Sequence, residues 1–511
     1  MSDDLEQAKG PDLTKGVVSA ELPEGGLLTG QVGDEVVVVA RVDGELFAIG
    51  GSCTHYHGPL GEGLLVGHTV RCPWHHGHFC LRTGEALAGP PIDPVAVWKP
   101  EERDGKIFVR SGAEARNPKP KARSGKAPRR ILIAGGGAAG FAAAEMLRRH
   151  GYDGGLSLVS SDADAPYDRP NCSKDFLAGE APAEWMPLRE DGWYKDHDID
   201  LRLKTEITKL DLGAHTAALK AGEDLSYDAL VLALGAEPQR PPIPGFDSPK
   251  VFTLRSLRDA EAIAAAAKAA HSVAIVGASF IGLEVAASLK HLGLEVHVVA
   301  PEAIPLARVL GDDVGRWIRG LHEAKGVVFH LGRKVQGFRD GKLGLDNGEA
   351  IAADFIVAGT GVRPRTALAE AAGLKVDNGV TVDRWLRASA DNVYAVGDIA
   401  RFPEAHTGKA IRVEHWVHAE RQGQHAARML LGDDAPFGDT PFFWSAHAGT
   451  TISYVGHADE FDAPKVEGSL EKEDALIRYA KDGRDLAVAT VGRDLDGLKA
   501  GRAFETQAAP S

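Results

Sequence analysis

The pattern of hydrophobic and polar residues changes twice along the chain of 511 residues. In the N-terminal part, short apolar runs alternate with glycine- and proline-rich turns, and the first long run predicts a β-hairpin that turns at Asp43-Gly44. Further on, apolar strands alternate with alanine-rich helices, as in 129–149 and 271–293, which predicts parallel sheets. From about Gly438, shorter strand-like segments return. The chain is therefore expected to contain a small all-β domain, two α/β domains and a C-terminal domain.

Residues 111–129 separate the first two patterns and contain no apolar side chain larger than alanine. A segment with so little apolar surface cannot fold by itself, and its Pro, Gly and basic residues predict a flexible linker. Basic runs of this kind also occur in nucleic-acid-binding arms. The whole chain, however, has a formal net charge of −14, so we expect a linker between acidic domains and no nucleic-acid partner.

The composition is that of a soluble globular protein, with 44% hydrophobic and 25% charged residues. The acidic N-terminus shows no secretory signal, and no apolar run approaches the ~20 residues that cross a bilayer. We therefore expect a cytoplasmic protein without a membrane partner. The 4 cysteines are too few for a disulfide scaffold of this size, so an important cysteine is expected to bind metal or to take part in chemistry.

Two loops rich in Gly and Pro each carry one cysteine and one histidine, as Cys53-x-His55 and Cys72-x-x-His75. Zinc fingers pair Cys with Cys and His with His at short spacings, which differs from this arrangement. Two loops that each supply one thiolate and one imidazole suit a 2Fe–2S cluster with inequivalent irons. The loops CTHYHGPLGEG and CPWHHGHF resemble those of the Rieske family. This resemblance implies that the two cysteines bind one iron and the two histidines bind the other.

One departure from the family refines this interpretation. High-potential Rieske proteins carry an additional cysteine in each loop, and the two are joined by a disulfide. Here, His57 and His78 stand at the comparable positions. The resemblance therefore implies a soluble, ferredoxin-type Rieske domain towards the lower end of the family's potential range. Cys80 is expected to be a small core residue, and the other nearby histidines are expected to support the loops or face solvent.

The first glycine-rich turn, Gly135-x-Gly137-x-x-Gly140, follows a predicted strand and opens a predicted helix. The first glycine makes the tight turn, the second lets backbone approach a pyrophosphate at the helix N-terminus, and the third packs the helix on the strand. Ala138 and Ala139 lie between the glycines. The next predicted strand ends just before Asp162, where an acid is expected to bind a ribose.

The second turn, 277–282, has Ser279 at the position of the middle glycine, which we expect to cost some backbone freedom. Its expected nicotinamide-binding residues are Gly277, Ser279, Phe280, Ile281 and Gly282. Glu302 follows the next strand, and an acid there favours NADH over NADPH. Arg308 keeps NADPH open as the alternative.

Two dinucleotide turns in one chain are typical of an FAD domain followed by a nicotinamide domain. Residues 227–245 resemble the segment that leaves the FAD domain, and 393–402 resemble the Gly-Asp motif. Residues 130–511 thus resemble flavin oxidoreductases of the glutathione-reductase-type fold, and more narrowly oxygenase-coupled ferredoxin reductases and apoptosis-inducing-factor-like proteins. The resemblance implies further cofactor-binding residues, with FAD at all but the last of them: Arg169, Lys174, Ile207, Asp398, Glu414, His415, Trp416 and, on the nicotinamide side, Gly361.

Disulfide reductases of this fold carry a C-x4-C pair beside the flavin, whereas residues 167–174 contain only Cys172. Dithiol chemistry is therefore excluded, and we expect Cys172 to be a packing residue. In the narrower family, a lysine near the reactive flavin nitrogen pairs with an acid, and these roles fall on Lys174 and Glu284 as catalytic residues. Trp444 is interpreted equally well as a core residue or as a wall of the cofactor site.

These motifs predict a multidomain chain with a small all-β Rieske domain, two Rossmann-like α/β dinucleotide-binding domains and a C-terminal α+β domain. The expected ranges are 12–110 for the Rieske domain, 111–129 for the linker, 130–245 and 370–432 for the FAD domain, 246–369 for the NAD(P)H domain, and 433–511 for the C-terminal domain. The C-terminal domain is expected to flank the flavin, and it leaves a homodimer interface open.

The cofactors together indicate an electron-transfer enzyme. NADH delivers two electrons as a hydride and a Rieske cluster carries one, so FAD is needed to convert between them. We expect electrons to pass from NADH through FAD to the cluster and on to an external ferredoxin, oxygenase or cytochrome. Two alternatives stay open: a flavoprotein that reduces a separate ferredoxin without using its cluster, and a slow-turnover, NADH-responsive sensor or interaction protein of the apoptosis-inducing-factor type.

Overall fold

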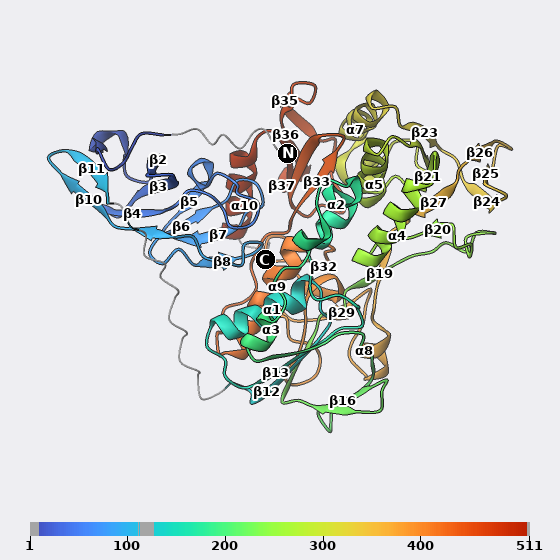
Figure 1. The fold of residues 1–511 in the computed structure, drawn as a ribbon, viewed down its shortest axis with the longest axis horizontal. Helices are drawn as coiled ribbons and strands as arrows, with labels where there is room; N and C mark the ends of the chain where they lie inside the picture. The colour runs from blue at the N-terminus through green and yellow to red at the C-terminus, as the bar shows by residue number, and fades with distance from the viewer. Residues whose placement is uncertain (1–9, 111, 113–126, 508–511) are drawn as a thin grey trace. The chain divides into compact units, whose positions relative to one another are not determined.

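The computed structural model describes residues 10–110, 112 and 127–507 of the chain. These fall into two compact units, one from residues 10–110 and 112 with 493–504, and one from residues 127–492 with 505–507 (Figure 1). Most of the expected linker at 111–129 lies outside the described residues, so the linker remains a prediction. No helix among the described residues has the length and apolar character needed to cross a membrane.

The first unit is built mainly from β-strands in three small sheets, of order β2-β3-β4-β9, β5-β6-β7-β8 and β1-β11-β10. The hairpin turns at Asp43 and Gly44 as predicted, and both residues have positive φ, as its tight turn requires. The strands are β1 (Val17–Val18), β2 (Leu27–Val32), β3 (Glu35–Val42), β4 (Glu45–Gly50), β5 (Leu64–Val66), β6 (Thr69–Arg71), β7 (His78–Cys80), β8 (Ala86–Ala88), β9 (Val97–Trp98), β10 (Pro100–Arg103) and β11 (Lys106–Val109).

Most of helix α10 (Asp494–Thr506), up to Phe504, belongs to the first unit, although it lies about 380 residues further along the chain than β11. Leu498 and Phe504 on this helix are buried. Burial and the nearby Glu62 carboxylate raise the pKa of Asp494. This grouping differs from the expected C-terminal domain over 433–511, because Arg493–Phe504 group with the N-terminal part of the chain.

The second unit begins with a five-stranded parallel sheet of order β14-β13-β12-β18-β30. Helix α1 (Ala138–Arg149) packs against α9 (Trp416–Leu430). The helices lie so close together that a Cβ atom at Gly423 would overlap the carbonyl oxygen of Ala139. The sheet strands are β12 (Arg130–Ala134), β13 (Gly155–Val159), β14 (Ile199–Arg202), β18 (Ala229–Leu232) and β30 (Val393–Ala395).

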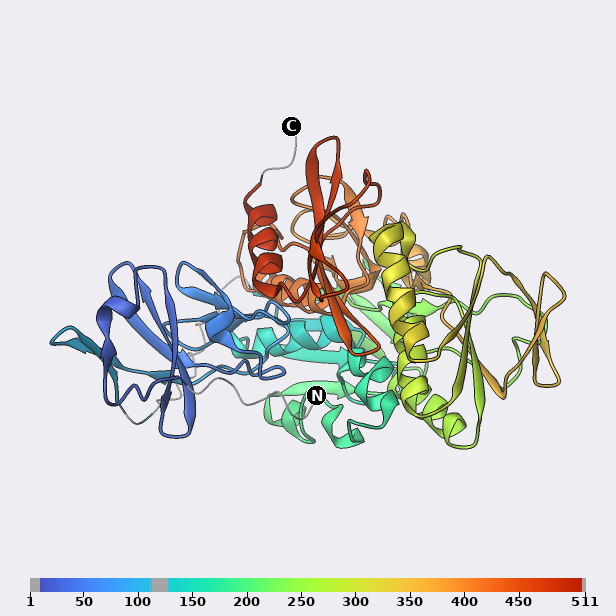
Figure 2. The ribbon, with the colours of Figure 1, turned by 90° about the horizontal axis from the view of Figure 1, so that it is seen from above.

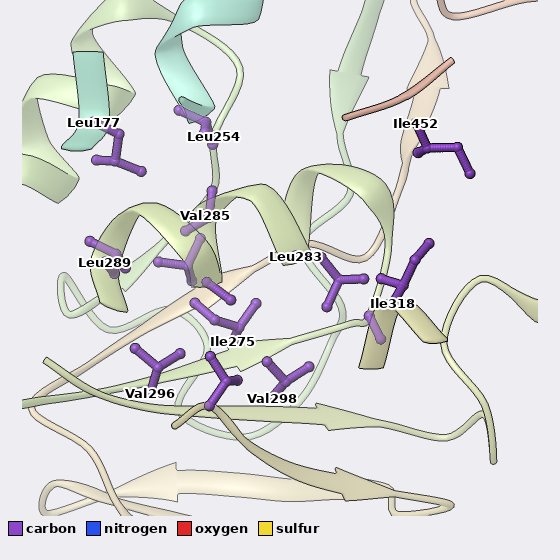
Figure 3. Close-up of a cluster of buried hydrophobic side chains, with 14 of the residues drawn as sticks. Leu177, Leu254, Ile275, Leu283, Val285, Leu289, Val296, Val298, Ile318 and Ile452 are labelled. Carbon is purple, nitrogen blue, oxygen red and sulfur yellow. The ribbon is translucent and has the colours of Figure 1, made fainter. Parts of the chain in front are cut away.

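A second parallel sheet has the order β20-β27-β21-β22-β23. Figure 3 shows its core, where Ile275, Val296 and Val298 from the strands meet Leu283 and Val285 from helix α5. The strands are β20 (Val251–Phe252), β21 (Ser272–Val276), β22 (Glu295–Ala300), β23 (Val328–Leu331) and β27 (Phe355–Ala358), and the helices are α4 (Leu257–Lys268), α5 (Phe280–His291), α6 (Ala307–Leu310) and α7 (Asp312–Ala324).

The third part of this unit is a five-stranded antiparallel sheet of order β33-β34-β37-β36-β35, drawn in red in Figure 2. Its inner residues join the same hydrophobic core as the second parallel sheet, which fixes β33 against that domain. The strands are β33 (Phe442–His447), β34 (Thr450–Gly456), β35 (Lys465–Ser469), β36 (Asp474–Lys481) and β37 (Arg484–Val491).

Short elements connect these three parts. Strands β19 (Ala236–Pro238) and β28 (Val362–Pro364) pair where the chain leaves the first parallel-sheet domain and where it returns. The remaining elements are α2 (Asp175–Ala178), α3 (Trp193–Asp196), α8 (Ala367–Ala371), β15 (Ile207–Asp211), β16 (Thr216–Leu219), β17 (Asp224–Ser226), β24 (Val335–Arg339), β25 (Lys342–Leu345), β26 (Ala350–Ala352), β29 (Val380–Thr381), β31 (Ala400–Pro403) and β32 (Ala410–Arg412).

Candidate functional site

A cavity of about 1210 Å³ lies in the second unit and receives both glycine-rich turns. Cavities at the carboxyl ends of parallel strands are where dinucleotides bind in such folds. The structure brings most of the predicted residues to this cavity: Gly135, Gly137, Ala138, Ala139, Asp162, Arg169, Lys174, Ile207, Ser279, Phe280, Ile281, Gly282, Glu284, Gly361, Asp398, Glu414, His415 and Trp416. Gly140, Gly277 and Glu302 are outside its lining.

The first turn joins β12 to α1. Gly135 has a φ of +118°, and a Cβ atom there would overlap the carbonyl oxygen of Ala233. A Cβ atom at Gly140 would overlap the Gly135 carbonyl oxygen, so this glycine serves helix packing rather than the cavity. Gly137 faces the cavity, where its Cβ would lie 3.4 Å from the Arg169 guanidinium. Backbone at the helix N-terminus is thus left open to an anionic ligand.

The second turn joins β21 to α5 and differs at its middle residue. Ser279 has a φ of −78°, so the expected cost in backbone freedom does not arise. Its hydroxyl accepts a hydrogen bond from the N–H of Gly282 (3.1 Å) and donates one to the carbonyl of Gly359 (2.9 Å). Serine here caps the helix and ties it to the end of β27.

The acids that follow the second strand of each domain have different surroundings. Asp162 accepts hydrogen bonds from the Tyr167 hydroxyl (2.9 Å) and from the Ala163 N–H (2.8 Å), which hold its carboxylate at the cavity wall. Glu302 is exposed beyond β22. Of the two predicted ribose-binding acids, the structure places only Asp162 in the cavity lining.

A cluster of charged groups surrounds Asp398. The carboxylate of Asp398 pairs with Arg255 at 2.7 Å, and the Nε atom of Arg169 is buried without a hydrogen-bond partner among the described residues. An orphaned guanidinium atom at a cavity wall fits a polar ligand such as a flavin nucleotide. Sequence reasoning missed Arg255, which precedes α4 and is 143 residues from its partner.

Lys174 and Glu284 meet as predicted. The Lys174 Nζ atom donates to the Glu284 Oε2 atom at 2.9 Å, and the Ser173 hydroxyl donates to the same oxygen at 2.6 Å. The Ser445 hydroxyl from β33 donates to the Oε1 atom at 2.7 Å. Trp444 lines the cavity, with the Lys174 Nζ atom 5.9 Å from its ring centre. The two serines were not identified from sequence, because no local pattern marks them.

Two side chains at the cavity have pKa values shifted strongly by burial. Burial lowers the pKa of His415 to about 3, so its imidazole is neutral at physiological pH. Burial raises the pKa of Cys172 to about 12, so its thiol stays protonated there. A protonated, buried thiol is a poor nucleophile, in agreement with the expected packing role of Cys172.

The cysteine–histidine loops lie in the first unit. Cys53 and Cys72 are both buried, and their thiols lie close enough to interact with each other. The Nδ1 atoms of His55 and His75 are 3.1 Å apart. A Cβ atom at Gly58 would come within 2.8 Å of the Cys72 sulfur, so this glycine keeps the space beside the thiol free.

These donors fit a 2Fe–2S cluster, because two sulfur donors form one pair and two imidazoles form another. Among the described residues, no group of three or more His, Cys, Asp or Glu side chains is arranged to hold a single metal ion. Cys80, in β7, is half-buried and lies outside the two pairs.

Comparison with known families defines the class of protein. Residues 129–423 match the family described as pyridine nucleotide-disulphide oxidoreductase, and residues 14–99 match the Rieske [2Fe-2S] domain. The chain belongs to the pyridine nucleotide-disulphide oxidoreductase family and carries a Rieske domain. It is an FAD-dependent NAD(P)H oxidoreductase with FAD, NADH and a 2Fe–2S cluster as its cofactors, which confirms the predicted class and cofactors.

Particular relatives include apoptosis-inducing factor 3 of Homo sapiens, 30% identical over 492 residues, which are 93% of this chain and 81% of that protein. Rubredoxin-NAD(+) reductase of Pseudomonas putida is 35% identical over 366 residues, covering 71% of this chain and 95% of that protein. Among solved structures, the covalent putidaredoxin reductase–putidaredoxin complex matches with a TM-score of 0.71 and 32% identity, covering 74% of this chain and 93% of that chain.

Proposed function

We propose that this chain passes electrons from NADH through FAD to its own Rieske cluster, and from there to an external acceptor protein. The observation that carries this proposal is the presence of both domains in one chain, with a relative that matches across 93% of it. When bound, FAD accepts a hydride and releases electrons singly, and the cluster carries one electron at a time. A covalent connection between the domains raises the effective concentration of the cluster at the flavin.

In this proposal, Cys53 and Cys72 bind one iron, and His55 and His75 bind the other. The residues proposed to bind FAD are Gly135, Gly137, Ala138, Ala139, Gly140, Asp162, Arg169, Lys174, Ile207, Asp398, Glu414, His415 and Trp416. The residues proposed to bind the nicotinamide nucleotide are Gly277, Ser279, Phe280, Ile281, Gly282, Glu302 and Gly361.

The side chains at the cavity support these roles. Lys174 presents a positive charge at the cavity wall, where it can stabilise negative charge on a reduced flavin, and Glu284 holds it in place at 2.9 Å. Arg255 and Asp398 neutralise one another beside the same wall. We therefore assign Lys174 and Glu284 to the reaction with the nicotinamide nucleotide. The proposal includes a cytoplasmic location, where thiols stay reduced.

The test separates the two electron paths. A Cys72→Ser variant is expected to lose the cluster signal in paramagnetic resonance, to keep NADH-dependent bleaching of the flavin, and to lose reduction of a protein acceptor. A Cys80→Ser variant, altered at a cysteine outside the proposed ligands, is the matched control and should behave as the wild type. Acceptor reduction that survives in Cys72→Ser would contradict the cluster route.

That contrary outcome would favour a second candidate function, a reductase that passes electrons directly from the flavin to a separate ferredoxin. The observation in its favour is the similarity of the second unit to a reductase solved in covalent complex with putidaredoxin. The sensor alternative predicts instead very slow flavin reoxidation by every carrier, together with NADH-dependent dimerisation measured by light scattering.

A further inference from the structure

We infer that Ser445 is a positioning residue for the reaction at the flavin, supplied by the C-terminal antiparallel sheet. This inference rests on the proposed function, because it takes Lys174 and Glu284 to act at the bound FAD. Three parts of the second unit meet at the Glu284 carboxylate: the segment before α2, helix α5 and strand β33. Ser445 is the contribution of β33.

The carboxylate of Glu284 is buried, with only 5% of the residue exposed. Its Oε2 atom accepts hydrogen bonds from Lys174 and Ser173, whereas its Oε1 atom accepts one from Ser445 at 2.7 Å. A buried ion pair is favourable only when good geometry and additional hydrogen bonds compensate the lost hydration. Ser445 supplies this compensation for Oε1, and at 1% exposure its place cannot simply be taken by bulk water.

The register between β33 and α5 explains how the hydroxyl reaches its partner. Residues two apart on a strand share a face, and residues four apart on a helix share a face. Phe443 on β33 packs edge-on against Phe280 on α5, with ring centres 4.9 Å apart. Ser445 lies two residues after Phe443, and Glu284 lies four residues after Phe280, so the hydroxyl and the carboxylate meet in the same register as the two rings.

Trp444, the residue before Ser445 on β33, contacts the other partner of the ion pair, Lys174. Trp444 lines the cavity with its ring centre 5.9 Å from the Lys174 Nζ atom. A cation near an aromatic face is attracted by the ring quadrupole. Adjacent residues of one strand thus act on the two partners of one ion pair, Trp444 on the lysine and Ser445 on the glutamate.

The test compares Ser445→Ala with Glu284→Gln and with their double variant in the FAD-loaded chain. Ser445→Ala removes the hydrogen bond to the carboxylate, so its negative charge is less well held opposite Lys174. We expect the flavin midpoint potential to move in the same direction as in Glu284→Gln, by a smaller amount. We also expect anaerobic flavin reduction at saturating NADH to slow about tenfold, with the KM for NADH changed less than about twofold.

The matched control is Thr490→Val, which removes a buried hydroxyl from strand β37 of the same sheet and should leave the potential and the rate unchanged. The double variant should differ little from Glu284→Gln alone, because Ser445 acts through that carboxylate. Ser445→Thr keeps a hydroxyl and should restore the wild-type potential. It also provides the measurement if Ser445→Ala loses FAD or unfolds.

A wild-type potential and rate in Ser445→Ala, beside a shifted potential in Glu284→Gln, would overturn the role of Ser445 alone. Effects that add in the double variant, or a Ser445→Thr variant that keeps FAD but has a shifted potential, would overturn it as well. An unchanged potential in Glu284→Gln would overturn the inference together with the proposed role of the ion pair. Reduction of the flavin by NADH comes before any electron transfer to the cluster, so none of these outcomes depends on the cluster route.

Discussion

The two glycine-rich turns of the second unit use the same backbone geometry, and among their three signature glycine positions they differ only at the middle one. In both turns, the first glycine has a positive φ and leaves no room for a Cβ atom beside a carbonyl oxygen of the neighbouring strand end. In both, the third glycine lets the helix contact the turn's own first carbonyl. The middle residue is Gly137 in one turn and Ser279 in the other.

The difference shows which glycines the fold itself needs. Ser279 adopts an ordinary extended φ, and its hydroxyl caps α5 and binds the Gly359 carbonyl. Gly137 lacks a side-chain cap and opens onto the cavity beside Arg169. The first and third positions are thus required by backbone packing, whereas the middle position lines the cavity in both turns and is not fixed by such packing.

The largest effect is expected where the two turns agree. Gly140→Ala and Gly282→Ala each place a methyl group against a carbonyl oxygen, and each should lower the free energy of unfolding by about 2–3 kcal/mol. Gly140→Ala should also release FAD. Denaturant unfolding and the ratio of flavin to protein measure both effects. In the control Gly320→Ala, the added Cβ on α7 meets nothing within 4 Å, and stability should rise by about 0.5–1 kcal/mol.

The next effect concerns the cavity side of the first turn. Gly137→Ser introduces the residue of the second turn where the ligand is expected to approach. Its Cβ would lie 3.4 Å from Arg169, so the fold should tolerate it, whereas FAD should bind about tenfold more weakly. Fluorescence titration of the FAD-depleted chain measures the affinity. An unchanged affinity would show that the middle glycine is not a ligand requirement.

A smaller effect is expected at the cap of the second turn. Ser279→Ala removes the acceptor for the Gly282 N–H and the donor to the Gly359 carbonyl, and should cost about 1 kcal/mol of stability. Thermal unfolding in the absence of nucleotide measures this loss. Stability equal to that of the wild type would mean that the cap is not part of what holds α5.

The smallest effect should follow from making the second turn like the first. Ser279→Gly is expected to cost only a few tenths of a kcal/mol, because glycine is itself an acceptable N-cap residue. The KM for NADH should stay within about twofold of the wild-type value. If Ser279→Gly proves as destabilising as Ser279→Ala, the serine contributes through its link to Gly359 more than through helix capping.

Local patterns predicted the turns, the alternation of strands and helices, and the cysteine–histidine loops, because each depends on residues close together in the sequence. The meeting of Lys174 with Glu284, 110 residues apart, was predicted from a family resemblance and is confirmed at 2.9 Å. Ser445 and Arg255 were not predicted. Their partners are 161 and 143 residues away, and a serine or an arginine in a short segment carries no periodic signal.

The placement of α10 shows the same limit. An amphipathic pattern indicates that a helix buries one face, but it does not name the partner. The expected domain over 433–511 followed the order of the chain, whereas Arg493–Phe504 groups with the N-terminal part. Domain boundaries that are predicted from chain order alone miss cases in which one helix from the end of the chain groups with an N-terminal unit.

The grouping of Arg493–Phe504 with the N-terminal strands affects the order in which the two units can be completed. Domains generally fold as units while the chain is synthesised, beginning with the N-terminal one. Here, the strands of the Rieske unit leave the ribosome first, but the unit also includes α10, whose Leu498 and Phe504 are buried. The unit that is begun first can therefore be completed only after both nucleotide-binding domains have been synthesised.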